Sequence, residues 1–110
     1  MTEAKFLITI DSIGEFRFNL HSRGNFKIIL RSSEGYKTRQ GCINGIQSVK
    51  ENSPFDSKYH RDKASNGLYY FVLKAANGEP LGISELYTTM AEREEGISAV
   101  KRDAPGAKIE

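Results

Sequence analysis

The residues with the strongest chemical character are a serine, a glutamate and a tyrosine that occur twice. They read Ser33-Glu34-x-Tyr36 and Ser84-Glu85-x-Tyr87. A serine beside a carboxylate suggests a nucleophile and a base, but adjacent residues of an extended strand point to opposite faces. No histidine recurs next to either copy. We therefore predict a structural role, in which the serine ends a strand, the glutamate lies near the positive end of the following helix, and the tyrosine packs beneath that helix.

The remaining reactive side chains do not form a recognisable site. His21 and His60 occupy different places in the two copies, and neither has a partner at metal-ligand spacing. Cys42 is the single cysteine, which excludes an internal disulfide, and its place on an apolar helix face predicts a buried small hydrophobic residue. We expect no catalytic residue, no metal site and no cofactor.

One surface has residues suited to binding. Alternation along two strands places six side chains on the sheet face that points away from the helices: Arg17, Asn19, His21, Tyr70, Val72 and Lys74. Open sheets with basic and aromatic side chains can stack single-stranded bases. An ordinary solvated face, or one used for dimerisation, fits the same residues. We take Arg17, His21, Tyr70 and Lys74 as the candidate binding face.

These residues lie on two tandem copies of one unit. Shifting the chain by 53 residues brings residues 14–20 onto 67–73, and a shift of 51 brings Gly45-Ile46 onto Gly96-Ile97. We place repeat 1 at 5–55 and repeat 2 at 57–110, within a single domain over 1–110, because a unit of ~50 residues buries too little surface to be stable alone.

Each unit is predicted to form three strands, a helix and a short extended piece. Residues 15–21 alternate as a half-buried strand does, and Asn77-Gly78 is a strong hairpin signal. The third strand is an apolar run that does not fix its facing. One helix face is predicted from apolar spacing in each unit: Cys42, Ile43, Ile46 and Val49, and Met90, Ile97, Val100 and Ala104.

The ends of both helices are also marked in the sequence. Thr38 and Thr89 are candidate N-caps, Thr89 as part of a capping box, and Pro54 and Pro105 end the helices. Each helix contains an internal glycine, Gly45 or Gly96, where glycine costs about 1 kcal/mol against alanine. We predict that close packing requires these glycines, rather than a ligand that approaches the backbone.

Three segments carry a resemblance to a known family. They are Leu73-Lys74-Ala75-Ala76-Asn77-Gly78, Ser84-Glu85-x-Tyr87 and Asn44-Gly45-Ile46-Gln47-Ser48-Val49. With them, nearly the whole chain resembles the YegP-like family of small bacterial proteins, whose members are single units that pair or tandem units. The resemblance implies an α+β fold, in which two units related by a pseudo-twofold axis build one antiparallel sheet, with both helices on one face and the C-terminal strands exchanged. It implies no activity and no functional residue. Repeat 1 departs from the family pattern at Ser22-Arg23-Gly24-Asn25.

Composition and charge restrict the function further. The chain of 110 residues is 38% hydrophobic and 27% charged, and it has no apolar run of the ~20 residues that a membrane span needs. From the residues at its start we expect no secretory signal. We therefore expect a cytoplasmic protein with no membrane partner. Residues 1–55 carry eight Lys and Arg against five Asp and Glu, but the net charge of +2 is too small to indicate nucleic acid by itself.

Taken with the repeat, these features predict a small non-enzymatic binding or interaction module whose partner is unknown. The alternatives are a nucleic-acid binder that uses the open sheet face, and an enzyme with a site at the seam between the repeats. We expect a monomer, in which the tandem copies stand in for a dimer of single units.

Overall fold

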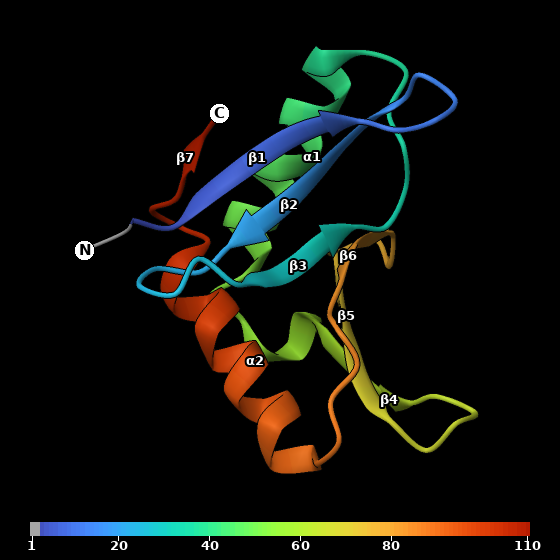
Figure 1. Cartoon of the computed structure of the whole chain (residues 1–110), viewed down its shortest axis with the longest axis vertical. Coiled ribbons are helices and arrows are strands. Elements are labelled where there is room, and N and C mark those ends of the chain that lie inside the picture. Colours follow the sequence, from blue (N-terminus) through green and yellow to red (C-terminus); the bar gives the residue numbers. More distant parts are fainter. Residues whose placement is uncertain (1–2) are drawn as a thin grey trace.

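The computed structural model describes residues 3–110 as one mixed sheet and two helices (Figure 1). The first repeat contains β1 (Lys5–Ile10), β2 (Phe16–His21), β3 (Ile28–Ser32) and α1 (Arg39–Asn52). A short 3-10 helix, η1 (Asp56–Lys58), leads into the second repeat, which contains β4 (Tyr59–Lys63), β5 (Tyr69–Lys74), β6 (Pro80–Ile83), α2 (Met90–Asp103) and β7 (Lys108–Ile109). The strand order is β4-β5-β6-β3-β2-β1-β7. The α+β fold of two repeats is thus confirmed.

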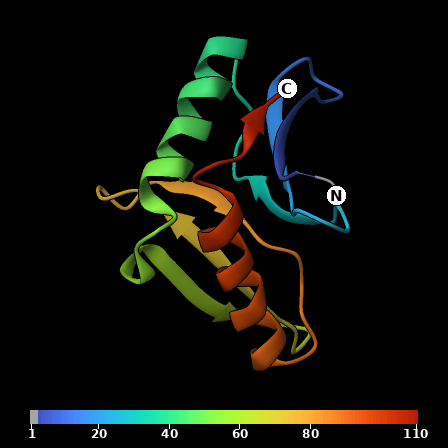
Figure 2. The ribbon, with the colours of Figure 1, turned by 90° about the vertical axis from the view of Figure 1, so that its left-hand side faces the viewer.

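The second strand of each repeat has the predicted alternation. Phe18 and Leu20 of β2 are buried, as are Phe71 and Leu73 of β5, while the side chains between them are partly exposed. Both strands pair antiparallel with the strands on either side. The sheet therefore has one apolar face, which both helices cover, and one face with polar side chains (Figure 2).

The third strand of each repeat contains a β-bulge, which explains why its apolar run did not fix its facing. In β3 the register shifts so that Leu20 pairs with Leu30 and His21 with Ile28, leaving Ile29 without a partner. In β6 the same shift leaves out Leu81. A bulge adds one residue to one strand of a pair. Consecutive residues can then both be buried, as Ile29 and Leu30 are.

The two helices begin and end where the sequence predicts. The Thr38 hydroxyl accepts a hydrogen bond from Gly41 N, and Thr89 forms the capping box with Glu92. Both helices stop two residues before a proline. Met90, predicted on the buried face of α2, is 57% exposed. This prediction was wrong because Met90 is the first residue of the helix, and the buried residues of α2 begin only at Gly96.

The repeats meet at the centre of the sheet, where β3 pairs with β6. Arg31 pairs with Ile83 there, and these two residues occupy equivalent places in the repeats, so the pseudo-twofold axis passes between them. Beside the axis, a Cβ added to Gly82 would lie 2.7 Å from Cγ of Leu30. A large residue of one repeat thus fills the space left by a glycine of the other.

The C-terminal strand of repeat 2 crosses to repeat 1, as the family resemblance implies. β7 pairs with β1, placing Lys108 beside Lys5 and Ile109 beside Phe6, and this pairing is parallel, unlike the others. The corresponding residues of repeat 1 lie in η1 and do not cross. They cannot form a strand beside β4, because the chain continues from them directly into β4. The exchange therefore occurs once.

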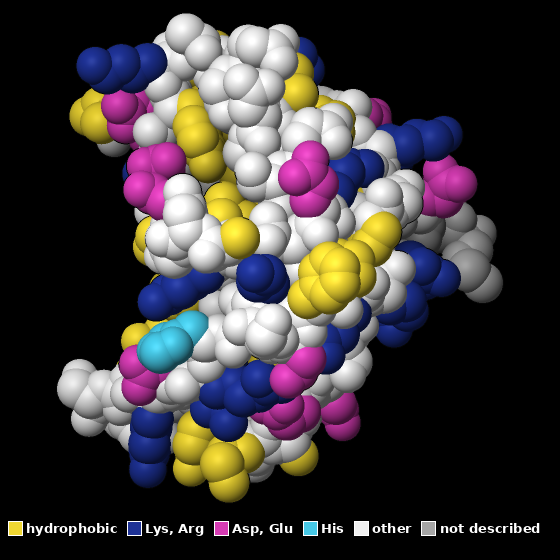
Figure 3. All heavy atoms as spheres, turned by 180° about the vertical axis from the view of Figure 1, so that it is seen from behind, with side chains coloured by type: hydrophobic (Ala, Val, Ile, Leu, Met, Phe, Trp, Pro, Cys, Tyr) yellow, Lys and Arg dark blue, Asp and Glu magenta, His cyan; other side chains and the backbone are white. Residues whose placement is uncertain are grey.

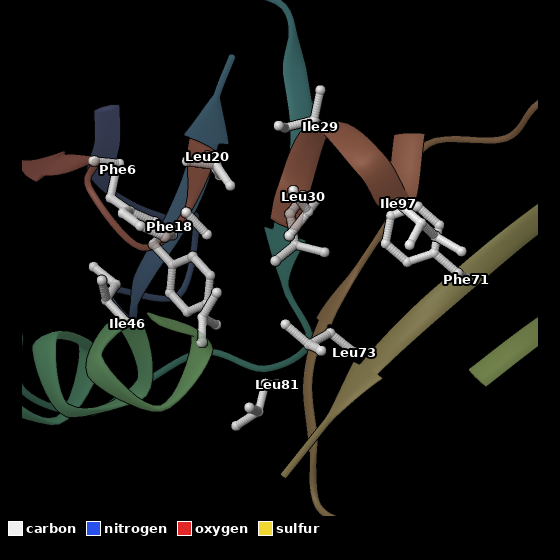
Figure 4. Packing of buried hydrophobic residues seen from close by; sticks show 14 of the residues in the cluster. Phe6, Phe18, Leu20, Ile29, Leu30, Ile46, Phe71, Leu73, Leu81 and Ile97 are labelled. Atoms are coloured by element: carbon white, nitrogen blue, oxygen red, sulfur yellow. The ribbon is translucent and has the colours of Figure 1, made fainter. Parts of the chain in front are cut away.

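A single hydrophobic cluster joins both repeats beneath the sheet (Figure 4). Helix α1 contacts β2 of its own repeat and β5 and β6 of the other, and α2 contacts β5 and β3. Because each helix packs on strands of both repeats, neither repeat has a core of its own.

Candidate functional site

The serine hydroxyls that first suggested chemistry are used within the sheet. Ser84 Oγ accepts a hydrogen bond from Phe71 N at 2.9 Å and donates to Glu85 O at 2.8 Å. In repeat 1 the equivalent contact, to Phe18 N at 3.3 Å, is made by Ser32 and not by Ser33. One extra residue between Ser32 and the following tyrosine explains the difference. The structural role is confirmed, but the sequence alignment selected the wrong serine in repeat 1.

The tyrosines of the same motif lie beneath the helices, as predicted. Tyr36 lies against Gly45 of α1, and Tyr87 lies against Gly96 of α2. A Cβ added at either glycine would fall 2.7 Å from Tyr36 Cζ or 2.8 Å from Tyr87 Cζ, and closer still to the hydroxyl oxygen. Burial raises the pKa of both tyrosines. The helical glycines therefore make room for a tyrosine of their own repeat.

The glutamate of the second motif has a different role from the one predicted. Glu85 Oε1 accepts a hydrogen bond from Arg31 Nε at 2.8 Å, across the junction of the two repeats. The position near the start of α2 is taken by Glu92, whose pKa is lowered chiefly by the hydroxyl of Thr88. The prediction that Glu85 serves the helix N-terminus was therefore wrong.

The histidine and cysteine side chains do not form a reactive pair. His21 Nδ1 lies 2.9 Å from Phe26 O, and its ring stacks on the Phe26 ring at 4.3 Å between centroids. Cys42 is fully buried, and burial raises the pKa of its thiol, which disfavours the reactive thiolate. In the described residues 3–110, no three His, Cys, Asp or Glu side chains are grouped as metal ligands would be.

The face of the sheet opposite the helices has a continuous row of side chains. Pairing from β4 to β1 runs through His60, Val72, Ile83, Arg31, Asn19 and Leu7, each beside the next. Arg17, His21, Tyr70 and Lys74 flank this row on the same face by strand alternation. We call the row and these four residues the open face. At its middle, Ile83 is 37% exposed, with partly exposed Val72 on one side of it and charged Arg31 on the other.

The four candidate residues of the open face form two separate groups. Arg17 and His21 lie on β2, whereas Tyr70 and Lys74 lie on β5, and β3 and β6 lie between them (Figure 1). Three strand spacings correspond to about 14 Å. A ligand that touches both groups must therefore also cover Arg31 and Ile83, which the sequence analysis did not single out because the pairing of β3 with β6 is not visible in the sequence.

Carboxylates neutralise much of the positive charge near this face. Arg17 Nε donates to Asp11 at 2.8 Å, and this bond is the largest cause of the lowered pKa of Asp11. Tyr70 lies 3.5 Å from Asp62. On the side of the molecule opposite to the view of Figure 1, basic and acidic side chains are likewise interspersed (Figure 3).

Comparison with protein families identifies the chain. A model described as "Domain of unknown function (DUF1508)" matches residues 11–59 and again residues 64–110. The chain belongs to the DUF1508 family. Its two matches correspond to the two repeats seen in the sheet, and the resemblance to YegP-like proteins is confirmed.

Relatives of this DUF1508 chain cover nearly its full length. A UPF0339 protein of Pseudomonas aeruginosa is 44% identical over 96% of this chain and 94% of its own length. The UPF0339 protein YegP of Escherichia coli K12 is 40% identical over 94% of this chain and 93% of its own length.

Two solution NMR structures of such proteins have the same fold. That of YegP from E. coli, described as a protein of unknown function, has a TM-score of 0.90 at 38% identity and covers 100% of this chain and 93% of its own. That of the UPF0339 protein SO3888 from Shewanella oneidensis has a TM-score of 0.88 at 36% identity, covering 99% and 91%. Among residues 3–110 of the chain, no helix has the length and apolar character to cross a membrane.

Proposed function

We propose that this DUF1508 protein is a small non-enzymatic binding module that contacts a protein partner through the open face. The observation that carries the proposal is the row across six strands, which both helices leave uncovered and whose middle holds partly exposed Val72 and Ile83. Interfaces commonly combine an apolar middle with a polar rim in which arginine is frequent. Because Asp11 and Glu85 pair with Arg17 and Arg31, the rim is of mixed charge, and a complementary partner surface carries both signs of charge as well.

A protein partner fits this face better than nucleic acid does. Base stacking needs aromatic rings along the path of the strand, and of the row and its flanking residues only Tyr70 presents a phenol or phenyl ring. The two arginines, Arg17 and Arg31, already bind carboxylates. At the seam, Ser84 and Glu85 are engaged in structural contacts, which does not favour an enzyme there. The lone Cys42 supports a cytoplasmic location.

The test compares the partners that are captured by the unaltered protein and by two variants. Ile83→Glu places a charge in the middle of the open face, and Gln47→Glu places the same charge on the exposed side of α1 as a matched control. We expect a bacterial partner that is retained by the unaltered protein and by Gln47→Glu but lost from Ile83→Glu. Titrated into 15N-labelled protein, that partner should shift amides of β3, β5 and β6.

Three results would count against the proposal. Equal retention by all three proteins, or shifts confined to the helices, would contradict the use of this face. A short single-stranded oligonucleotide that shifts the same strands, with an affinity that falls steeply as salt rises, would assign the face to nucleic acid instead.

A further inference from the structure

In one contact between the repeats, the end of a helix binds an arginine side chain of the same chain. The loop between β2 and β3 of repeat 1 lies beside the C-terminal end of α2 (Figure 1). There Arg23 donates from Nε to Asp103 at 2.6 Å, from its backbone N to the same carboxylate at 3.2 Å, and from its guanidinium to Arg102 O at 3.3 Å. The Asp103 side chain is fully buried. An arginine thus closes the space between a hairpin loop and a helix end.

The equivalent place in the other half of the molecule lies between the β5–β6 loop and the C-terminal end of α1 (Figure 2). Each loop begins with a backbone N–H that donates across it, from Ser22 to Lys27 O and from Ala75 to Glu79 O, which makes Ala76 the counterpart of Arg23. The loop of repeat 1 is one residue longer. The helices correspond with an offset of 51 residues, so Asn52 replaces Asp103 and Glu51 replaces Arg102. The arginine and the aspartate that fill the first site are therefore both missing from the second.

A wide cleft of about 540 Å³, largely open to solvent, lies where the arginine would be. Its lining residues come from α1, η1 and the β5–β6 loop: Ser48, Glu51, Asn52, Phe55, Lys58, Ala75, Ala76 and Asn77. The counterparts of Arg23, Asp103 and Arg102 are all among them. The helix end and the first residues of the loop are equivalent in the two repeats, and in repeat 1 they hold a guanidinium group. The cleft therefore offers a place for a second one on the other side of the pseudo-twofold axis.

The chemistry of the cleft also suits a cation. Asn52 Nδ2 donates to Ser48 O at 2.8 Å, so its amide oxygen is the acceptor that remains. The C-terminal carbonyl groups of α1 carry the negative end of the helix dipole. Glu51 adds an exposed carboxylate, and the Phe55 ring, 57% exposed, is placed for a cation–π contact.

The balance of charge is the same in both places. Arg102 and Asp103, which receive Arg23 in the closed site, carry no net charge together, and neither do Glu51 and Lys58 of the cleft. A planar guanidinium group matches carboxylate and carbonyl acceptors better than an ammonium group does.

We propose that this cleft binds the guanidinium group of an arginine side chain presented by a peptide or protein partner. The site lies on α1 and the β5–β6 loop, so it does not depend on the open face or on the function proposed for it. The ligand takes the place that Arg23 occupies in the other repeat.

The test titrates N-acetyl-arginine methylamide into the full-length 15N-labelled protein, with N-acetyl-citrulline methylamide as an uncharged probe of the same shape. We expect shifts of amides in residues 48–55 and 75–78 with the arginine probe only, with an affinity in the millimolar range. Removal of the exposed charge in Glu51→Gln should weaken binding roughly two- to five-fold, as loss of an exposed ion pair does. Phe55→Ala should weaken it roughly two- to five-fold.

The closed site at Asp103 suggests a second variant, which tests the proposal by adding a contact to the cleft and not by removing one. Ala76→Arg together with Asn52→Asp rebuilds the arginine–carboxylate pair inside the cleft, and should raise Tm while abolishing the shifts. Asn44→Asp adds the same negative charge to an exposed position of α1 and should leave binding unchanged. Equal shifts with the citrulline probe, shifts elsewhere, undiminished binding by Glu51→Gln, or no shifts at millimolar arginine probe would each overturn the proposal.

Discussion

The contact between Gly45 and Tyr36 can be tested by adding one methyl group. In Gly45→Ala the new Cβ would lie 2.7 Å from Tyr36 Cζ, so the ring or the helix must move. Overpacking of this kind destabilises a protein by about 1–3 kcal/mol, whereas alanine is favoured over glycine in a helix by about 1 kcal/mol. We expect a net loss of about 1 kcal/mol, which lowers Tm by about 4–8 °C in a domain of this size.

A second background separates the two effects. With Tyr36→Ala the clash is gone, so adding Gly45→Ala to that variant should stabilise it by about 1 kcal/mol, because only the helix propensity remains. The sign of the substitution therefore reverses between the two backgrounds. Urea and thermal unfolding followed by circular dichroism measure the effect of Gly45→Ala on stability with and without Tyr36. Gln47→Ala, at an exposed position of α1, controls for helix propensity alone.

Two results would refute this account. Gly45→Ala could raise Tm in the unaltered protein, or it could have the same effect with and without Tyr36. Gly96→Ala repeats the test in the other repeat, where the added Cβ would lie 2.8 Å from Tyr87 Cζ. The two glycines lie on different helices and contact different tyrosines, so we expect their effects to add in the double variant.

Three further predictions concern contacts within and between the repeats. Asp103→Ala should destabilise the protein by about 2–4 kcal/mol, because it removes charge-assisted hydrogen bonds from Arg23 and Arg102. Chemical unfolding measures this loss of stability. A loss smaller than that caused by replacing an exposed aspartate with alanine would contradict the prediction. Burial alone would raise the pKa of Asp103, but these bonds outweigh burial and lower it. The stability that the Asp103 carboxylate contributes is therefore present above pH ~4, the usual aspartate value, and is lost as pH falls through the lowered pKa. When unfolding is measured from pH 7 downward, the free energy of unfolding should fall less for Asp103→Ala than for the unaltered protein. Gly82→Ala should cost about 1–3 kcal/mol through its clash with Leu30, and unchanged Tm would refute the fit at the seam. Thr89→Ala should cost about 1 kcal/mol through loss of the N-cap, again measured by unfolding.

Features set by nearby residues were predictable from the sequence. Thr38 and Thr89 cap their helices through contacts three residues away, and the alternation in residues 15–21 determines which side of β2 is buried. The repeat added a longer-range result, because a helical glycine that recurs in both copies predicts close packing. That a tyrosine of the same repeat fills this place became visible only in the structure.

Features that depend on distant pairing were not predictable in the same way. The bulges at Ile29 and Leu81 appear only when β3 and β6 pair with their neighbours. The bond from Arg23 to Asp103 joins residues 80 positions apart. The candidate binding residues alternate with the buried residues of β2 and β5. Their separation into two groups follows from the order of strands, which local patterns do not determine.

Fusion of the two units explains why the repeats differ where they do. In a dimer of identical units, a residue beside the twofold axis meets the same residue of its partner. Leu30 lies beside the axis against Gly82, and leucine at both places would clash. In one continuous chain each half can have its own residue, so a large and a small side chain fit together. The same freedom allows an arginine to close the site at Asp103 while its counterpart at Asn52 stays open to a ligand.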